Sequence, residues 1–344
     1  MRVIAIFQFS ALTMAIFVCS GPLGMGQATP TTAGVTYKPL TTMVETEPSV
    51  KIEVLDWGGS GPPLVLLAGL GAAAHNFDSF ALALRPSFHV YAISRRGYGG
   101  SSAPRPTGEN YSADRLADDV LAVLDRLRIH RPLLVGHSLA GEELSSIGSR
   151  TPERVCGLVY LDAGYRYALS RPGLGDLQID IISMRRYLAA ALDGISAADE
   201  KSAVEAFLKE LPEFEKELNT YLIALSHAAP VSADEIAKDR AERESPQGRA
   251  ERAILDSEQR FASIRCPVLA IFAYPHQLPK EITGQARVEA ERRDMEFVDQ
   301  RAGLFRVLPN ARVVLLPHAT HGVQDSRRVD VLKDIQEFAG KVER

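Results

Sequence analysis

The sequence is short of cysteine and has no excess of basic side chains. Three cysteines among 344 residues exclude a disulfide-rich scaffold and a multi-cysteine zinc array. The 43 Asp and Glu side chains outnumber the 39 Lys and Arg side chains, so neutralisation of a nucleic-acid backbone is excluded as a main role. Because 46% of the residues are hydrophobic, a large buried core is expected.

Charge is also scarce at the start of the chain, where Arg2 is the only charged side chain among the first 28 residues. An apolar stretch from Val3 to Val18 follows, and then small and turn-forming residues up to Ala28. This order is typical of a secretory signal peptide, with cleavage expected after Ala28 and a secreted or periplasmic location. A retained membrane anchor is the alternative, and a lipoprotein anchored through Cys19 is not expected. Residues 29–48, rich in Thr, Pro and Gly, are expected to form a flexible lead-in.

Long apolar runs are absent beyond this segment, and short ones alternate with helical patterns. Helices are expected over ranges that include 111–127, 139–149 and 330–338. Alternating apolar and polar residues predict a half-exposed strand at 50–57, and apolar runs predict strands at 63–68, 88–93, 132–135, 156–161, 267–272 and 311–316. Apolar strands that alternate with helices are typical of an α/β fold with a mostly parallel sheet covered on both faces.

Residues 163–265 interrupt this alternation. They are poor in strand patterns and rich in charge, with helical stretches such as 202–222 and 233–258. We interpret them as a helical cap inserted between two parts of the core, 49–162 and 266–344. A separate C-terminal domain is the alternative, but the return of apolar strand patterns after the cap argues against it.

A serine lies between small residues at a strand-to-helix junction. The segment is Gly136-His137-Ser138-Leu139-Ala140, preceded by an apolar strand and followed by a helical pattern. Such a tight turn requires small residues two positions either side of the serine, and it raises the hydroxyl above the sheet. Ala140 replaces the glycine of the strict G-x-S-x-G pattern. The spacing predicts a nucleophile elbow with Ser138 as the nucleophile.

A serine hydroxyl needs a base, and two histidines follow the last expected strand. His321 directly precedes Gly322 and the final helix, which is the better placed of the two for this role. His318 lies nearer the strand end and is expected to be structural. The other histidines, among them His137 and His276, are interpreted as structural as well.

The base needs a carboxylate that orients its ring. No acid lies close after the expected strand at 267–272, whereas Asp162 directly follows the strand at 156–161. The sequence therefore predicts Ser138, Asp162 and His321 as catalytic residues. A structural aspartate that caps the following turn is the alternative for Asp162.

Acyl transfer also needs donors for a developing oxyanion. The backbone N–H of Leu139, at the start of its helix, is one candidate. The loop after the strand at 63–68 is rich in glycine, which lets backbone N–H groups turn inward. Leu70 in that loop is the second expected donor.

These motifs together resemble the α/β-hydrolase fold family from about residue 50 to the end. The resemblance rests on Gly69-Leu70-Gly71, Arg95 to Ser102, Gly136 to Gly141, and His321-Gly322. An acid on the strand before the cap is similar to the arrangement in several dehalogenases and some lipases. Those dehalogenases use an aspartate nucleophile, so Ser138 indicates acyl transfer to water instead.

The resemblance implies a serine hydrolase that cleaves a carboxylic ester through an acyl-enzyme, and the signal-peptide pattern implies that it is exported. A cofactor-free perhydrolase or haloperoxidase on the same triad is an alternative, and so is a non-catalytic homologue that binds a small molecule. No cofactor, metal or nucleic-acid partner is expected. The expected partner is a small ester-like substrate, with no stable membrane span after signal cleavage, and the oligomeric state is left open.

Two further expectations concern the cap. Its candidates to line the substrate pocket are Tyr165, Tyr167, Met184 and Leu188, with packing in the cap's own core as the alternative. In a fold of this family, the strands that flank the cap are expected to be neighbours. Cys156 and Cys266 begin those strands, so a disulfide between them is predicted for an exported protein. Two buried thiols are the alternative.

Overall fold

The computed structural model describes residues 37–107, 109–170, 177–192, 196–226 and 232–342. The predicted signal peptide over residues 1–28 lies outside the described residues and stays a prediction. Among the described helices, none combines the length and the apolar character that a bilayer span requires.

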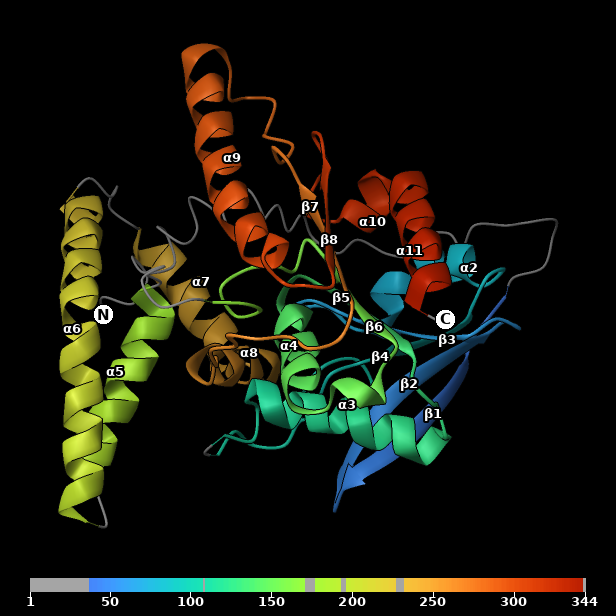
Figure 1. The fold of residues 1–344 in the computed structure, drawn as a ribbon, viewed down its shortest axis with the longest axis horizontal. Helices are drawn as coiled ribbons and strands as arrows, with labels where there is room; N and C mark the ends of the chain where they lie inside the picture. Colours follow the sequence, from blue (N-terminus) through green and yellow to red (C-terminus); the bar gives the residue numbers. More distant parts are fainter. Residues whose placement is uncertain (1–36, 108, 171–176, 193–195, 227–231, 343–344) are drawn as a thin grey trace.

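The core is an eight-stranded sheet with the order β1-β2-β4-β3-β5-β6-β7-β8. β1 pairs antiparallel with β2, and β2 with β4, while all the other neighbours are parallel. The strands are Leu40–Glu47 (β1), Val50–Gly58 (β2), Pro63–Leu67 (β3), His89–Ile93 (β4), Leu133–His137 (β5), Gly157–Leu161 (β6), Val268–Ala273 (β7) and Ala311–Leu316 (β8). The expected α/β class is confirmed, because the strands form a mostly parallel sheet that helices cover on both faces (Figure 1).

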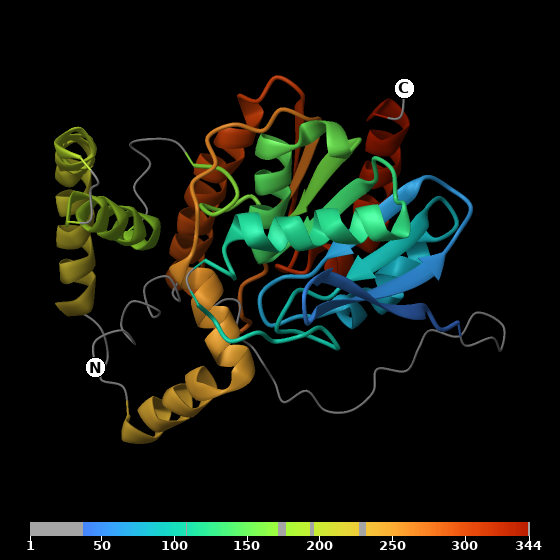
Figure 2. The ribbon, with the colours of Figure 1, turned by 90° about the horizontal axis from the view of Figure 1, so that it is seen from below.

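Two hydrophobic clusters lie on opposite faces of this sheet. Side chains of α3, α4, α8 and α9 build one cluster, and those of α2 and α11 build the other (Figure 2). The helices are Asp78–Leu84 (α2), Ala113–Leu127 (α3), Gly141–Arg150 (α4), Leu177–Leu192 (α5), Ala197–Ser226 (α6), Ala233–Glu244 (α7), Pro246–Asp256 (α8), Gly284–Arg306 (α9), Val323–Ser326 (α10) and Arg328–Val342 (α11), with short 3-10 turns at Ala74–Phe77, Ser138–Ala140 and Pro152–Arg154. Successive residues of a strand face opposite sides, so each buried strand contributes to both clusters.

β1, Leu40–Glu47, corrects the expectation of a flexible lead-in over residues 29–48 for that part of the segment, while residues 29–36 lie outside the described residues. This strand forms the edge of the sheet, and its Val44 is buried. The β-branched residues Thr41, Thr42 and Val44 favour an extended edge strand. The Thr, Pro and Gly content of the whole segment concealed this short pattern.

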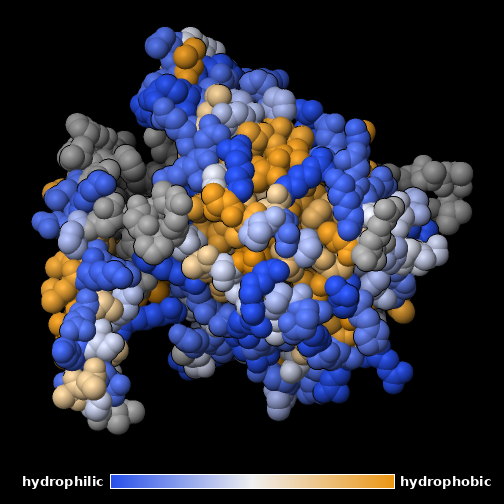
Figure 3. Space-filling model, in the orientation of Figure 1, coloured by the Kyte–Doolittle hydropathy of each residue, from blue (hydrophilic) through white to orange (hydrophobic). Residues whose placement is uncertain are grey.

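Residues 163–265 hold α5 to α8, between β6 and β7. The helical pattern expected over 233–258 is divided, because the Ser245 hydroxyl accepts the backbone N–H of Gly248 and Pro246 starts a new helix there. α5 and α6 pack against each other at one end of the molecule, away from the sheet (Figures 1 and 2). Their outer surface carries hydrophobic side chains (Figure 3), among them Leu192 and Leu208.

The structure does not form the predicted disulfide between Cys156 and Cys266. Cys266 belongs to the cluster against α4, whereas Cys156 packs against the cluster on the opposite face of the sheet. Burial, with a smaller effect of nearby Cys156, raises the pKa of the Cys266 thiol to about 12. Two side chains on opposite faces cannot meet the geometry of a disulfide, although their strands are neighbours.

Candidate active site

Ser138 lies at the sharp turn from β5 into α4. Its backbone is left-handed, with a φ of 52°, which a serine adopts only when the surrounding structure imposes it. The turn is tight, since a Cβ atom on Gly136 would lie 2.9 Å from the Cδ1 atom of Leu144. The side chain of Ser138 is half-buried. This local geometry is that of the predicted nucleophile elbow.

Asp162 and His321 come together beside this turn. Asp162 follows β6 and is fully buried, and its Oδ2 atom lies 2.7 Å from Nδ1 of His321. His321 follows β8, and its ring centre is 4.6 Å from that of His137, the residue directly before Ser138. The structure thus brings the three predicted residues to the carboxyl edge of the sheet, where active sites of open α/β sheets lie.

The Asp162 carboxylate is held by several donors. Its Oδ2 also accepts from the Tyr165 hydroxyl at 3.0 Å and from His276 at 2.8 Å, and its Oδ1 accepts the backbone N–H of Ala273 at 3.3 Å. Burial acts to raise the pKa of Asp162, but the His276 charge and the hydrogen bonds from His276 and His321 hold that pKa well below its usual range. Asp162 is therefore ionised in the folded protein and can orient the His321 ring.

His137 supports His321 through the backbone. Its Nε2 atom is 3.0 Å from the carbonyl oxygen of His321. Burial, aided by repulsion from His321, lowers the pKa of His137 to about 3, so its ring is neutral and donates Nε2–H to that carbonyl. His318, the alternative base, is exposed to solvent.

The loop expected to supply an oxyanion donor lies directly against the nucleophile. A Cβ atom on Gly69 would lie 3.0 Å from the Ser138 Cβ and 3.2 Å from Nδ1 of His137. Only a glycine permits this approach, which places the backbone of Gly69 and Leu70 beside the serine. Leu139 opens the 3-10 turn that follows the serine. Leu70 and Leu139 therefore flank Ser138.

A buried ion pair joins this loop to the elbow helix. Arg95 Nη2 lies 2.7 Å from Oε2 of Glu143 on α4, and it also donates to the carbonyl oxygen of Ala68 at 2.9 Å. Both charged side chains are almost fully buried. The pair fixes the loop that holds Gly69 and Leu70 relative to the helix that follows Ser138.

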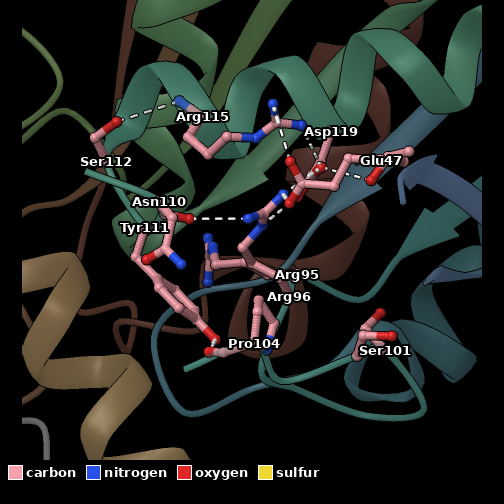
Figure 4. Close-up of polar contacts among 12 residues, drawn as sticks. Glu47, Arg95, Arg96, Ser101, Pro104, Asn110, Tyr111, Ser112, Arg115 and Asp119 are labelled. Carbon is pink, nitrogen blue, oxygen red and sulfur yellow. Dashed lines mark hydrogen bonds and ion pairs between the residues drawn. The ribbon is translucent and has the colours of Figure 1, made fainter. Parts of the chain in front are cut away.

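The next residue, Arg96, ties β1 to α3 (Figure 4). Its fully buried guanidinium contacts Asp119 at 2.6 Å and Glu47 at 2.9 Å, and it donates to the carbonyl of Asn110 at 3.0 Å. Burial acts to lower the pKa of Arg96, but the hydrogen bonds and charges of Asp119 and Glu47 raise it. This network positions the loop that follows β4.

The four candidate pocket residues separate into two pairs. Tyr165 donates to Asp162, and the Tyr167 hydroxyl is hydrogen-bonded to that of Ser138. Met184 and Leu188 lie on α5, which packs against α6 at a distance from the elbow (Figure 1). Leu188 is half exposed and Met184 is buried, and their role in lining the pocket stays a prediction. Sequence could not reveal which part of the cap folds back onto the core.

A groove of about 760 Å³ adjoins the oxyanion loop. Leu70 forms one wall, and α7 and α8 form the others, through residues that include Glu242, Gly248, Glu251 and Leu255. Ser138 itself is not among the lining residues. The groove beside Leu70 is therefore walled by α7 and α8, which lie within the predicted cap but hold none of the four candidate pocket residues.

His276 is the site residue that sequence reasoning missed. It follows β7, is 2% exposed, and has its Nε2 atom 2.8 Å from Asp162 and its Nδ1 atom 2.9 Å from Asp294 of α9. Its position after a strand's carboxyl end was an available signal. The sequence offered no comparable signal for Asp294, because helix α9, which carries it, was not expected.

Asp162, His276 and His321 are also the described residues whose ligand atoms cluster closely enough to suggest a metal site. The two imidazole nitrogens lie 2.8 and 2.7 Å from one carboxylate oxygen. These are hydrogen-bond separations, and they account for the cluster without an ion.

Comparisons with known proteins support the fold described above. A sequence model of the alpha/beta hydrolase fold family matches residues 62–194. Over these residues the chain is similar to the α/β-hydrolase fold family, and its sheet and covering helices have that fold. A fluoroacetate dehalogenase from a Burkholderia species is 36% identical over 107 residues, which are 30% of this chain and 35% of that protein. The chain spans about a third of the length of the curated relatives that it matches at 36% identity.

Two solved structures share the fold. A bromoperoxidase from Bacillus anthracis, at 20% identity, covers 88% of this chain and all of its own, with a TM-score of 0.55. A thermophilic esterase from Thermogutta terrifontis, at 18% identity, covers 89% of this chain and all of its own, with a TM-score of 0.54. At this level of identity the likeness shows that the fold is shared and no more.

Proposed function

We propose that this chain is a serine hydrolase that cleaves carboxylic esters. One observation carries the proposal: a serine in a strained elbow lies beside a histidine whose Nδ1 is held by a buried, ionised aspartate. The three groups supply a nucleophile, a base and an orienting charge, which acyl transfer requires together.

The reaction would begin with attack of the Ser138 Oγ on the ester carbonyl. His321 would take the serine proton at Nε2, because Asp162 holds Nδ1. The carbonyl oxygen would become an oxyanion between the backbone N–H groups of Leu70 and Leu139. His321 would then return the proton to the departing alkoxide, leaving an acyl group on Ser138.

Water would complete the cycle by the same steps. His321 would accept a proton from a water molecule as its oxygen attacks the acyl carbonyl. Collapse of the second tetrahedral intermediate would release the carboxylic acid, and His321 would return the proton to Ser138. No redox step or external cofactor is needed for this balance.

Ser138 also helps to distinguish ester hydrolysis from two other reactions, dehalogenation and perhydrolysis. Dehalogenases that resemble this chain use an aspartate nucleophile, so the serine argues against the activity named for the Burkholderia relative. Perhydrolysis on the same triad would replace water by hydrogen peroxide. Bromination of monochlorodimedone in the presence of acetate, bromide and peroxide would reveal it.

The proposal is tested with short p-nitrophenyl esters. Ser138→Ala is expected to lower kcat by about 10⁴-fold or more, because the covalent route is lost. Ser146→Ala, which changes a serine on α4 outside the elbow, serves as the control. Equal turnover by wild type and Ser138→Ala would refute the proposal, and so would a wild-type protein inert to every ester tried.

We also propose that the chain is exported, on the pattern of residues 1–28 alone. N-terminal sequencing of the protein recovered from outside the cytoplasm should then begin at Thr29. Recovery of the intact N-terminus would contradict cleavage at Ala28.

A further inference from the structure

His276 lies buried between two carboxylates. Its Nε2 is 2.8 Å from Oδ2 of Asp162, and its Nδ1 is 2.9 and 3.1 Å from the two oxygens of Asp294. Its backbone N–H also donates to Asp294, at 2.7 Å. The ring is therefore fixed at both nitrogens and at the backbone.

This arrangement determines the charge of His276. A neutral imidazole has one N–H, whereas here both nitrogens face carboxylates, which accept hydrogen bonds only. An imidazolium satisfies both bonds. Burial acts to lower the pKa of His276, but the attraction of Asp162 and the hydrogen bonds to both aspartates raise it to about 10.

The groups around His276 and His321 come from several elements. Asp162 and Tyr165 follow β6, and the Tyr165 hydroxyl is 3.4 Å from Nε2 of His276. Asp294 comes from α9, and the neutral His137 comes from β5. Asp162, His276 and Asp294 together carry one net negative charge, which lies next to His321.

We propose that His276 and Asp294 are positioning residues that extend the Ser138-His321-Asp162 triad by two members. His276 holds the orientation of the Asp162 carboxylate, and Asp294 balances the positive charge that His276 brings. The net charge that faces His321 then equals that of a lone aspartate. The inference rests on the proposed ester hydrolysis.

The proposal predicts opposite shifts of the acid limb in the pH profile of kcat/KM, which reports the protonation of His321. His276→Gln removes a positive charge, so the limb should move to higher pH. Asp294→Asn removes a negative charge, so the limb should move to lower pH. Each shift should be about half to one pH unit, as expected when one charge is removed at this distance from His321.

The double variant separates charge from structural damage. His276→Gln with Asp294→Asn restores the net charge, so the acid limb should return to within about 0.2 pH units of wild type. Asp299→Asn removes the same charge from the same helix, but its carboxylate contacts the Tyr274 hydroxyl instead, so the limb should stay in place. Single variants that shift in the same direction, or a double variant that does not return, would overturn the proposal.

Imidazole titration followed by NMR on the full chain gives a second readout. The His321 pKa should rise in His276→Gln and fall in Asp294→Asn, whether or not any ester is hydrolysed. Unchanged His321 titration would overturn the inference, while an inert wild type with shifted titration would count against the proposed function alone. If His276→Gln fails to fold, the direction in which the His321 pKa moves in Asp294→Asn still tests the proposal: a fall supports it, and a rise overturns it.

Discussion

At the residue scale, the elbow helix carries a second unusual group besides Ser138. Glu142 is fully buried, and neither carboxylate oxygen has a hydrogen-bond partner within the described part of the chain. Burial, followed by repulsion from Glu143, raises the pKa of Glu142 well above its usual range. Over a range of pH, its carboxyl group is therefore neutral in the folded protein, whereas the same group is ionised in the unfolded chain.

This difference makes stability depend on pH. Above pH 4.5 the unfolded state binds fewer protons at Glu142 than the folded state, so stability falls as pH rises. Glu142→Gln should remove that loss and raise the free energy of unfolding at pH 8 more than at pH 5. The gain is at most about 1.4 kcal/mol for each pH unit. Urea denaturation at the two pH values measures it.

Glu205→Gln is the matched control, because Glu205 lies exposed on α6. Its substitution should change the free energy of unfolding equally little at both pH values. A Glu142→Gln variant that is less stable than wild type at pH 8 would contradict the account.

At the residue scale, local sequence patterns pointed to residues that the structure places together at the carboxyl edge of the sheet. Ser138, Asp162 and His321 each follow a strand that reads as apolar, and the structure gathers them. His276 follows such a strand too, but its role depends on Asp294, which the sequence separates from it by a loop. Long-range pairs of this kind leave no local pattern.

At the element scale, the Arg96 network decides how β1 joins the sheet. Asp119→Ala should leave the buried guanidinium short of its main partner and lower the free energy of unfolding by about 3–5 kcal/mol. Asp125→Ala, on the same helix, removes an exposed partner of Arg154 and should cost less than about 1 kcal/mol. Guanidinium or urea denaturation compares the two. Equal costs would contradict a structural role for the buried network.

Element prediction was accurate for the strands from β2 to β8, whereas β1 was missed. Strands β3, β6 and β7 are apolar throughout, so their patterns appear in the sequence. β1 is short and half exposed, and its stability depends on β2 and Arg96 rather than on its own composition. Helix α9 mixes charged and apolar residues without a clear face, which explains why it was not expected.

At the scale of the whole molecule, the inserted segment is not one unit. Ala250 and Ile254 of α8 belong to the main hydrophobic cluster, whereas α5 and α6 pack mainly against each other (Figure 2). Ile254→Ala should therefore lower the free energy of unfolding by about 2–5 kcal/mol.

Leu208 of α6 is 58% exposed, so Leu208→Ala should change the free energy of unfolding by no more than about 0.5 kcal/mol. Denaturation of the two variants, followed by tryptophan fluorescence from the buried Trp57, makes the comparison. Comparable losses from both would show that α5 and α6 stabilise the core as much as α8 does.

The central claim is that Ser138 is a nucleophile activated by the His321–Asp162 pair. Mass spectrometry of the protein treated with a fluorophosphonate tests it most directly, because the reagent bonds covalently to an activated serine. The account predicts one adduct per chain, located on Ser138, absent from Ser138→Ala and formed far more slowly in Asp162→Asn. An adduct on another residue, or none in a protein that still hydrolyses esters, would contradict it.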